Sequence, residues 1–252
     1  MLTVLSPAKD LAVAPSTKGT QPRMLDRSEL LVAKLRGYSA KRLGKLMDIS
    51  PKLAELNHQR YKEWSVPFTT KNARPAVFTF NGEAYRGLNA KTLDASDLDF
   101  AQHHLRILSG LYGVLRPMDL MRPYRLEMGT ALPTSRKKDL YAFWGESIAA
   151  LLRDDLRESG SDVLINLASA EYFKAVRPNV VDARVITPVF KDKGPTGYRM
   201  VMVFAKHQRG AMARHIIQHR LLDPEKLKQY TGDGYRFAKE ESTANEWVFL
   251  RG

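Results

Sequence analysis

Cysteine is absent from the 252-residue sequence. The chain therefore forms no disulfide, thiolate zinc site or iron–sulfur cluster, and peroxidase chemistry that uses a thiol is excluded. No apolar run approaches the roughly 18 residues that a transmembrane helix needs. The first nine residues also lack the basic segment and the apolar length of a secretion signal. We therefore expect a cytoplasmic protein that has no membrane partner.

Motifs for the common cofactors are missing as well. The sequence contains no Walker loop, no Gly-x-Gly-x-x-Gly after a predicted strand and no Gly-x-Ser-x-Gly elbow. His215 and His219 have metal-ligand spacing, but the Glu of a His-Glu-x-x-His motif is missing and Arg214 and Arg220 disfavour a cation. Direct iron sequestration is disfavoured because no cluster of carboxylates with Glu-x-x-His spacing is found. We expect no cofactor and no metal, and an enzyme is the less favoured interpretation.

Positive charge, by contrast, is in excess. Lys and Arg number 40 against 27 Asp and Glu, which gives a net charge of +13. A field of this sign attracts polyanions and speeds their encounter with the protein. The basic residues gather in three stretches without an acid, at 30–47, 100–118 and 193–222. Exposed helices usually mix charges, because opposite pairs stabilise them. These stretches favour contact with nucleic-acid phosphates, and the alternative is a basic face with no partner.

Hydrophobic periodicity predicts a mixed α/β (α+β) fold with a mixed sheet. Strands are expected at 2–5, 76–80, 162–167, 185–190 and 198–205, with two more between 235 and 250. Helices are expected at 26–36, 39–47, 50–64, 96–108, 139–158, 169–176 and 207–219, with a short one after Pro224. No repeat and no low-complexity linker interrupts these elements. We therefore expect one compact domain over residues 1–252.

A Gly-x-x-Gly turn follows the helix that is predicted at 96–108. Its glycines, Gly110 and Gly113, let the backbone come close to a ligand, and such a turn can point N–H groups at a phosphate. Helix-hairpin-helix DNA-binding elements work in this way, but their glycines are closer together. A glycine C-cap followed by a strand at 112–115 therefore stays open as the alternative. The predicted DNA contacts are the arginines around this turn and the basic residues of the third stretch: Arg106, Arg116, Arg122, Arg125, Lys206, Arg209 and Arg214.

Polar side chains also follow two predicted strands. Ligands bind at the carboxyl ends of strands in open α/β sheets. The ammonium group of Lys9 suits a phosphate or carboxylate, and Glu171 would be a general base if buried. Ser169 is equally suited to capping the next helix. The residues expected to line a pocket for a small anionic ligand are Ser6, Lys9, Asn166, Ser169, Glu171 and Tyr172. This pocket keeps open an alternative function, an enzyme acting on a nucleotide or a nucleic-acid base.

Several strings occur together in one order along nearly the whole chain: 5–9, 109–117, 123–129, 166–169 with 171–174, and Lys206 with Arg209-Gly210. In these strings the sequence resembles the YaaA family of peroxide-stress proteins. The resemblance implies a cytoplasmic bacterial protein of the hydrogen peroxide response that limits iron-dependent damage. It also implies a compact α/β fold with a basic cleft, and binding of double-stranded or distorted DNA through a helix-hairpin-helix-like element, which we place at about 96–125.

Overall fold

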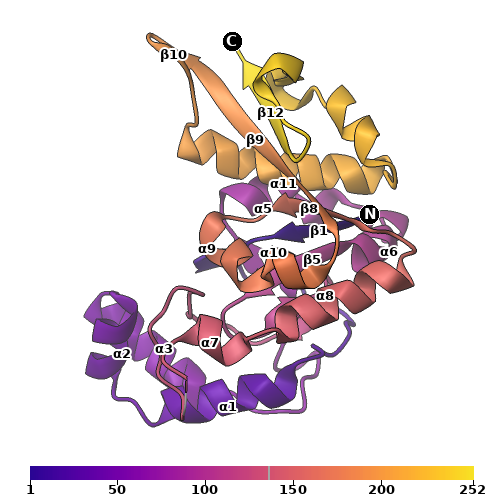
Figure 1. Cartoon of the computed structure of the whole chain (residues 1–252). Helices are drawn as coiled ribbons and strands as arrows, with labels where there is room; N and C mark the ends of the chain where they lie inside the picture. Colours follow the sequence, from indigo (N-terminus) through magenta and orange to yellow (C-terminus); the bar gives the residue numbers. More distant parts are fainter. Residues whose placement is uncertain (136) are drawn as a thin grey trace.

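A mixed sheet of eight strands runs through the middle of the computed structural model, which describes residues 1–135 and 137–252 (Figure 1). Seven strands follow the order β11–β12–β9–β8–β1–β5–β6, and β10 pairs with the end of β9. Their bounds are β1 Leu2–Leu5, β5 Leu105–Ser109, β6 Gly113–Leu115, β8 Val163–Leu167, β9 Arg184–Gly194, β10 Gly197–Arg199, β11 Arg236–Phe237 and β12 Glu246–Arg251. The predicted fold class, a single compact α/β domain with a mixed sheet, is confirmed.

The central strand β1 is parallel to both β5 and β8, and its four residues are all buried. Such burial is expected of a parallel strand that is covered on both faces, and it explains why β1 is uniformly apolar or β-branched. Parallel neighbours also bring the carboxyl ends of β1 and β8 to the same edge of the sheet. That edge positions the pocket described below.

Eleven α-helices are found in the described residues. Their bounds are α1 Leu25–Arg36, α2 Ala40–Met47, α3 Pro51–Glu63, α4 Ala76–Thr79, α5 Glu83–Leu88, α6 Ala95–His104, α7 Leu140–Trp144, α8 Ser147–Glu158, α9 Ala170–Phe173, α10 Pro178–Val181 and α11 Met202–Gln218. α11 contacts β1, β8 and β9, and Figure 1 shows α11 and α8 on opposite sides of the sheet. Among the described residues, no helix combines the length and the apolar composition needed to cross a membrane.

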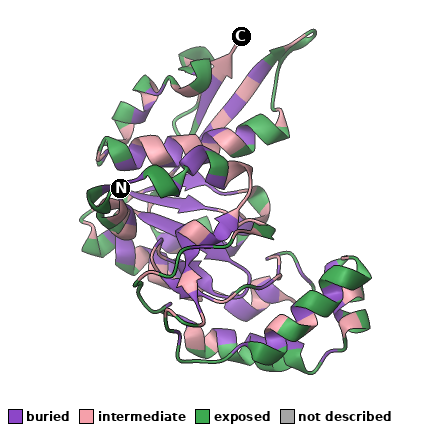
Figure 2. Ribbon diagram, turned by 180° about the vertical axis from the view of Figure 1, so that it is seen from behind, coloured by how far each residue is buried: buried purple, intermediate pink, exposed green. Residues whose placement is uncertain are grey.

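The helices α1, α2 and α3 form a unit at the end of the molecule farthest from α11 (Figures 1 and 2). Their starts follow from local sequence: Ser39 accepts a hydrogen bond from the backbone of Arg42, and Ser50 accepts one from Leu53. Pro51 occupies the first helical position, where its missing N–H costs nothing. The three predicted helices over 26–64 are confirmed. Figure 2 shows α2 and α3 largely exposed, with the buried residues concentrated around the sheet.

Three expectations about single elements are wrong. Residues 76–79 form the helix α4, and only Phe80–Asn81 is a strand, β4, which pairs with β2 (Asp10–Leu11). The predicted helix at 139–158 is broken at Gly145, whose φ of 55° ends α7 before α8 begins. The predicted strand at 198–205 ends at Arg199, and its apolar residues from Met202 start α11 instead. A short apolar run does not distinguish a strand from a buried helix.

The segment placed as a helix-hairpin-helix-like element is a β-hairpin. α6 ends at His104, and β5 and β6 pair antiparallel with Ile107 opposite Leu115 and Ser109 opposite Gly113. The glycines serve packing in this hairpin. A Cβ on Gly113, whose φ is 67°, would lie 2.7 Å from the sulfur of Met24. A Cβ on Gly110 would overlap the carbonyl oxygen of Leu126. The helix-hairpin-helix prediction for 96–125 is therefore wrong, and the alternative of a strand after the glycine is correct.

Candidate functional site

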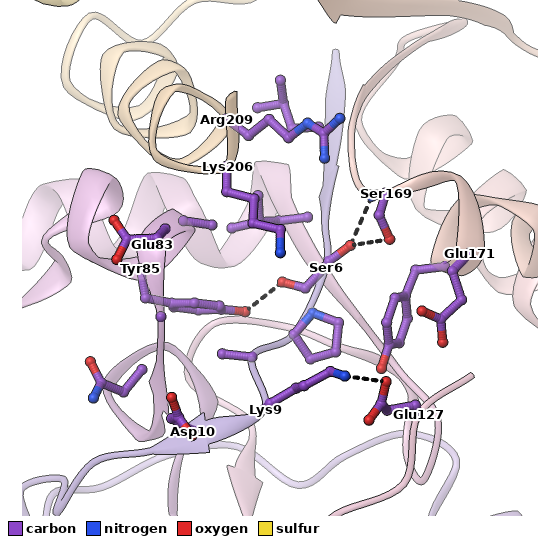
Figure 3. Close-up of a pocket in the computed structure, with 18 of the residues that line it drawn as sticks. Ser6, Lys9, Asp10, Glu83, Tyr85, Glu127, Ser169, Glu171, Lys206 and Arg209 are labelled. Carbon is purple, nitrogen blue, oxygen red and sulfur yellow. Dashed lines mark hydrogen bonds and ion pairs between the residues drawn. The ribbon is translucent and has the colours of Figure 1, made fainter. Parts of the chain in front are cut away.

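A cavity of about 650 Å³ opens at the carboxyl ends of β1 and β8 (Figure 3). It is enclosed by the segment after β1, the start of α5, the loop 124–127, α9 and the first turns of α11. Five of the six residues predicted for a ligand pocket line it: Ser6, Lys9, Ser169, Glu171 and Tyr172. Three residues predicted as DNA contacts, Arg125, Lys206 and Arg209, line it too.

Hydrogen bonds between the two strand ends fix the floor of this cavity. The hydroxyl of Ser6 accepts a hydrogen bond from the backbone N–H of Ser169 at 2.9 Å, and its oxygen lies 3.3 Å from that of the Ser169 hydroxyl. The phenol of Tyr85, on α5, donates to the carbonyl oxygen of Ser6 at 3.0 Å. Asn166, on β8, does not reach the cavity; its side-chain oxygen Oδ1 accepts a hydrogen bond from the backbone N–H of Ala168 at 3.0 Å. Asn166 therefore shapes the strand end without lining the cavity.

One wall of the cavity is acidic and partly neutralised. The carboxylate of Glu127 lies 2.8 Å from the ammonium of Lys9 and 3.0 Å from the guanidinium of Arg125. Lys9 is therefore already paired with Glu127, which it shares with Arg125, and is not reserved for a ligand. Glu127 is two residues from Arg125 in the sequence, but its ion pair with Lys9 could not be predicted, because the two segments are distant in the chain.

Glu171 and Tyr172 complete that wall from α9. The carboxylate of Glu171 accepts a hydrogen bond from the backbone N–H of Gly129 at 2.9 Å, which holds the loop 124–129 against α9. Burial, reinforced by the nearby Tyr124 and Glu171, raises the pKa of the Tyr172 phenol far above its usual range. At neutral pH Tyr172 is thus a neutral hydroxyl group that can donate or accept a hydrogen bond.

The opposite wall carries two cations from α11. Figure 3 shows the ammonium of Lys206 and the guanidinium of Arg209 pointing from the helix into the cavity. Within the described residues, neither is paired with a carboxylate. Burial lowers the pKa of Arg209, and no neighbouring acid offsets that effect. A half-buried arginine without an acidic partner is only partly stabilised by water, so this wall is suited to an anion that would supply the missing charge.

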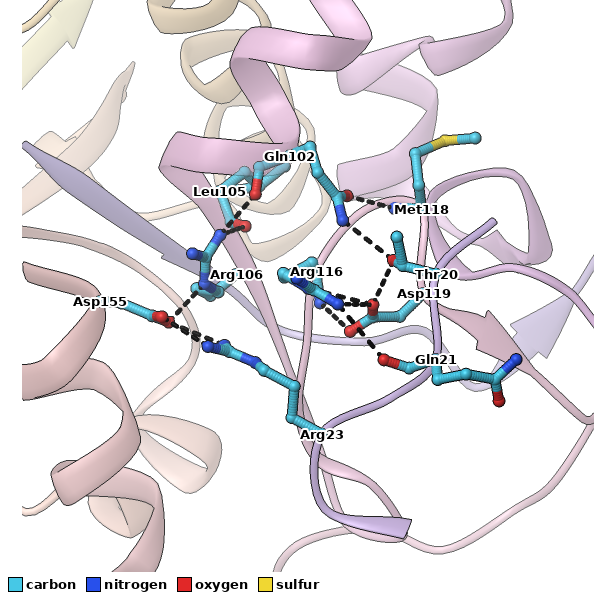
Figure 4. A network of polar contacts seen from close by, with 10 residues as sticks. All are labelled: Thr20, Gln21, Arg23, Gln102, Leu105, Arg106, Arg116, Met118, Asp119 and Asp155. Atoms are coloured by element: carbon cyan, nitrogen blue, oxygen red, sulfur yellow. Dashed lines mark hydrogen bonds and ion pairs between the residues drawn. The ribbon is translucent and has the colours of Figure 1, made fainter. Parts of the chain in front are cut away.

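The remaining predicted DNA contacts have partners inside the protein. Arg106 is 4% exposed, and its guanidinium meets the carboxylate of Asp155 at 2.6 Å (Figure 4). Arg23 reaches the same carboxylate with two hydrogen bonds of 2.6 and 2.8 Å. Burial opposes ionisation of Asp155, but the hydrogen bonds from Arg23 and Arg106 prevail and hold its pKa below the usual range. Arg106 is therefore a buried structural residue and offers no charge to DNA.

Arg116 and Arg214 are also engaged. Arg116 binds the carboxylate of Asp119 at 2.9 Å and the carbonyl oxygen of Gln21 (Figure 4). Arg214 donates to the carbonyl oxygens of Leu88 and Asn89, which close the end of α5. α2 also lies far from α11, with the sheet between them (Figure 1). The three acid-free stretches are therefore not side by side in the fold.

Arg122 keeps part of its charge at the surface. It is half-buried, and its guanidinium donates to the hydroxyl of Ser65 at 3.1 Å. No carboxylate pairs with it in the described part of the chain. It is thus the one member of the arginine group at 106–125 that still faces solvent without an acidic neighbour.

The first acid-free stretch presents its charge differently. Lys41, Arg42 and Lys45 are all exposed on α2, and this helix contains no acidic residue. The guanidinium of Arg42 stacks on the ring of Tyr38 at 3.7 Å, which orders the arginine without neutralising it. We call these three residues the α2 basic patch. It lies on an exposed helix, so a polyanion can reach it without a change in the fold.

Comparison with known proteins shows which family the chain belongs to. A family model described as peroxide stress protein YaaA matches residues 1–241. A UPF0246 protein of Cupriavidus metallidurans is 54% identical and is aligned over 100% of this chain and 98% of its own length. A UPF0246 protein of Ralstonia nicotianae is 52% identical over 100% of this chain and 99% of its own. One from Neisseria meningitidis serogroup B is 48% identical, with 100% and 98% covered. The resemblance seen in the sequence is confirmed.

Proposed function

The chain belongs to the YaaA family of peroxide stress proteins, and we propose that it serves the peroxide response by binding DNA through the α2 basic patch. The observation that supports this proposal is the set of three exposed cations, Lys41, Arg42 and Lys45, on a helix without an acid. Lys41 and Lys45 are one turn apart and therefore share a face of the helix. Side chains in this arrangement can contact successive phosphates along a strand.

Such binding would be driven by phosphates and would be largely indifferent to sequence. Lysine and arginine contacts to phosphate position a protein on DNA but do not read bases. Each contact releases condensed cations from the duplex. If ferrous ions are among the cations displaced, binding limits the iron-dependent oxidation of DNA. That consequence links a basic protein without thiols or a metal-binding motif to peroxide resistance.

The test is a binding titration on a short duplex over a range of salt concentrations. Each phosphate contact contributes about 0.9 to the slope of log affinity against log salt. Replacing Lys41, Arg42 and Lys45 together by Ala should therefore flatten the slope by about 2.7 and weaken binding on all sequences alike.

A matched control separates a local patch from total charge. Lys71, Lys91 and Lys193 are exposed on other segments, and their joint replacement by Ala removes the same net charge. We expect this control to bind DNA with nearly the wild-type slope. Equal weakening in both triple variants would reduce the effect to net charge and reject the patch. A wild-type protein that does not bind duplex at low salt would reject DNA binding itself.

A further inference from the structure

The cavity at the ends of β1 and β8 has a charge arrangement that DNA binding by α2 does not explain. Lys206 and Arg209 are three residues apart on α11, so both point to the same side of the helix and into the cavity (Figure 3). Neither has an acidic partner within the described residues. The guanidinium group presents a planar pair of N–H donors that matches two oxygens of a phosphate, and an ammonium group adds a third contact. This end of the cavity is built for a phosphate-like anion.

The size of the cavity requires more than inorganic phosphate. Its volume of about 650 Å³ lies in the middle of the range of small-molecule pockets, about 300–1,000 Å³. A lone phosphate at Lys206 and Arg209 would leave the other wall without a contact. A ligand that fills the cavity must therefore extend from α11 toward the loop 124–127 and α9.

The far wall offers hydrogen-bond acceptors and aromatic rings. The carboxylates of Glu127 and Glu171 line it together with Tyr124 and Tyr172, and Tyr85 of α5 lies across the cavity from these carboxylates (Figure 3). Carboxylates accept hydrogen bonds from the amino groups of nucleobases, and aromatic rings stack on bases of any sequence. An amino-bearing heterocycle meets both requirements.

The charges of the residues that line the cavity favour a ligand with a single phosphate group. Four cationic residues and four acidic residues line the cavity: Lys9, Arg125, Lys206 and Arg209, and Asp10, Glu83, Glu127 and Glu171. Lys206 and Arg209, which have no acidic partner within the described residues, match the double charge of one phosphate, whereas the acidic residues elsewhere in the lining would repel the further phosphates of a triphosphate. A monophosphate is the better match.

We propose that this cavity binds a nucleoside monophosphate whose base carries an amino group. The phosphate lies against Lys206 and Arg209, and the base lies among the tyrosines with its amino group toward Glu127 or Glu171. The site is independent of the α2 basic patch. A triple α2 variant that has lost DNA affinity should therefore bind the nucleotide as the wild type does, so the two proposals fail separately.

Calorimetric titration with a set of related probes tests the proposal. Adenosine 5′-monophosphate should bind most tightly, and adenosine, inorganic phosphate, uridine 5′-monophosphate and adenosine triphosphate should each bind about tenfold more weakly or worse. Equal affinity for inorganic phosphate would overturn the nucleotide assignment. Equal affinity for the uridine nucleotide would overturn the role of the amino group. Failure of the adenosine, guanosine and cytidine 5′-monophosphates alike to bind would overturn the proposal as a whole.

Variants of the basic wall locate the site. Arg209→Ala and Lys206→Ala should each reduce affinity for adenosine 5′-monophosphate about tenfold or more. Arg209→Lys keeps the charge but loses the planar pair of donors, so its affinity should fall between those of the wild type and Arg209→Ala. Arg199→Ala, at an exposed arginine on β10, is the control and should leave affinity unchanged. Loss of affinity in Arg199→Ala equal to that in Arg209→Ala would reject the placement. Circular dichroism confirms that each variant is folded.

Discussion

The crossing of α5 and α11 should be the most sensitive point of the pocket, and Gly210→Ala tests it. A Cβ on Gly210 would overlap the carbonyl oxygen of Ala84, and it would lie 2.5 Å from the carbonyl carbon of Ala84 and 2.9 Å from the backbone nitrogen of Leu88. Carbon atoms pack at about 3.5–4.0 Å, so the contact with the carbonyl carbon alone requires the two helices to separate by about 1 Å, and the overlap with the carbonyl oxygen requires more. Overpacking of this kind costs about 1–3 kcal/mol. In a chain of this length that corresponds to a fall in Tm of roughly 2–12 °C.

The same displacement should weaken nucleotide binding, because Lys206 and Arg209 lie on the part of α11 that must move. Scanning calorimetry measures the Tm, and titration with adenosine 5′-monophosphate measures the affinity. Gly37→Ala is the matched control, since a Cβ there would meet nothing closer than the carbonyl oxygen of Lys34 at 3.5 Å and its φ is −75°. If Gly210→Ala has the Tm of Gly37→Ala, the close packing of α5 against α11 is not as described.

Two further predictions concern buried polar groups. Asp155→Asn leaves Arg106 without its counterion and should lower the free energy of unfolding by about 3 kcal/mol. This value is at the lower end of the range for breaking a buried ion pair, because the second partner, Arg23, is partly exposed to solvent. The pKa of Asp155 is lower in the folded than in the unfolded state, where it is about 3.9, so the wild type should lose this stability as the pH falls below about 5. Denaturant unfolding should show a smaller difference in the free energy of unfolding between wild type and Asp155→Asn at pH 3 than at pH 7. The same difference at both pH values would contradict this prediction. Tyr85→Phe removes the hydrogen bond to Ser6 and should lower the free energy of unfolding by about 1 kcal/mol. An unchanged free energy of unfolding would show that this hydrogen bond does not stabilise the fold.

Local signals in the sequence predicted the elements whose ends are chemically marked. Ser39 and Ser50 with Pro51 determine where α2 and α3 begin, and the structure shows both caps. The apolar strand at 2–5 is likewise recognisable because a strand buried on both faces contains little else. In contrast, the apolar run after Met200 fits a strand or a helix, and the packing of the later residues of α11, around Gly210, against α5 favours the helix.

The pocket was predictable in outline because parallel strands end at the same edge of a sheet. That rule placed Ser6, Lys9 and Ser169 together, and the structure confirms that they line one cavity. It could not assign the basic wall, because nothing in the sequence near 206–209 shows that α11 crosses the carboxyl ends of β1 and β8. Lys206 and Arg209 were therefore assigned to a DNA surface, although their side chains point into the cavity.

Charge counted along the chain differs from charge presented to solvent because acids from outside the basic stretches, near or distant in the chain, pair with their residues. The stretch at 100–118 contains no acid, yet Asp155 and Asp119 neutralise its two arginines from outside it. The basic residues of α2 are not paired in this way, because α2 lies away from the sheet and from Asp119 and Asp155 beside it. An acid-free stretch therefore predicts a phosphate-binding surface only where the fold carries it away from the core. On this criterion α2 is suited to a polyanion, and the wall formed by Lys206 and Arg209 is suited to a single small anion.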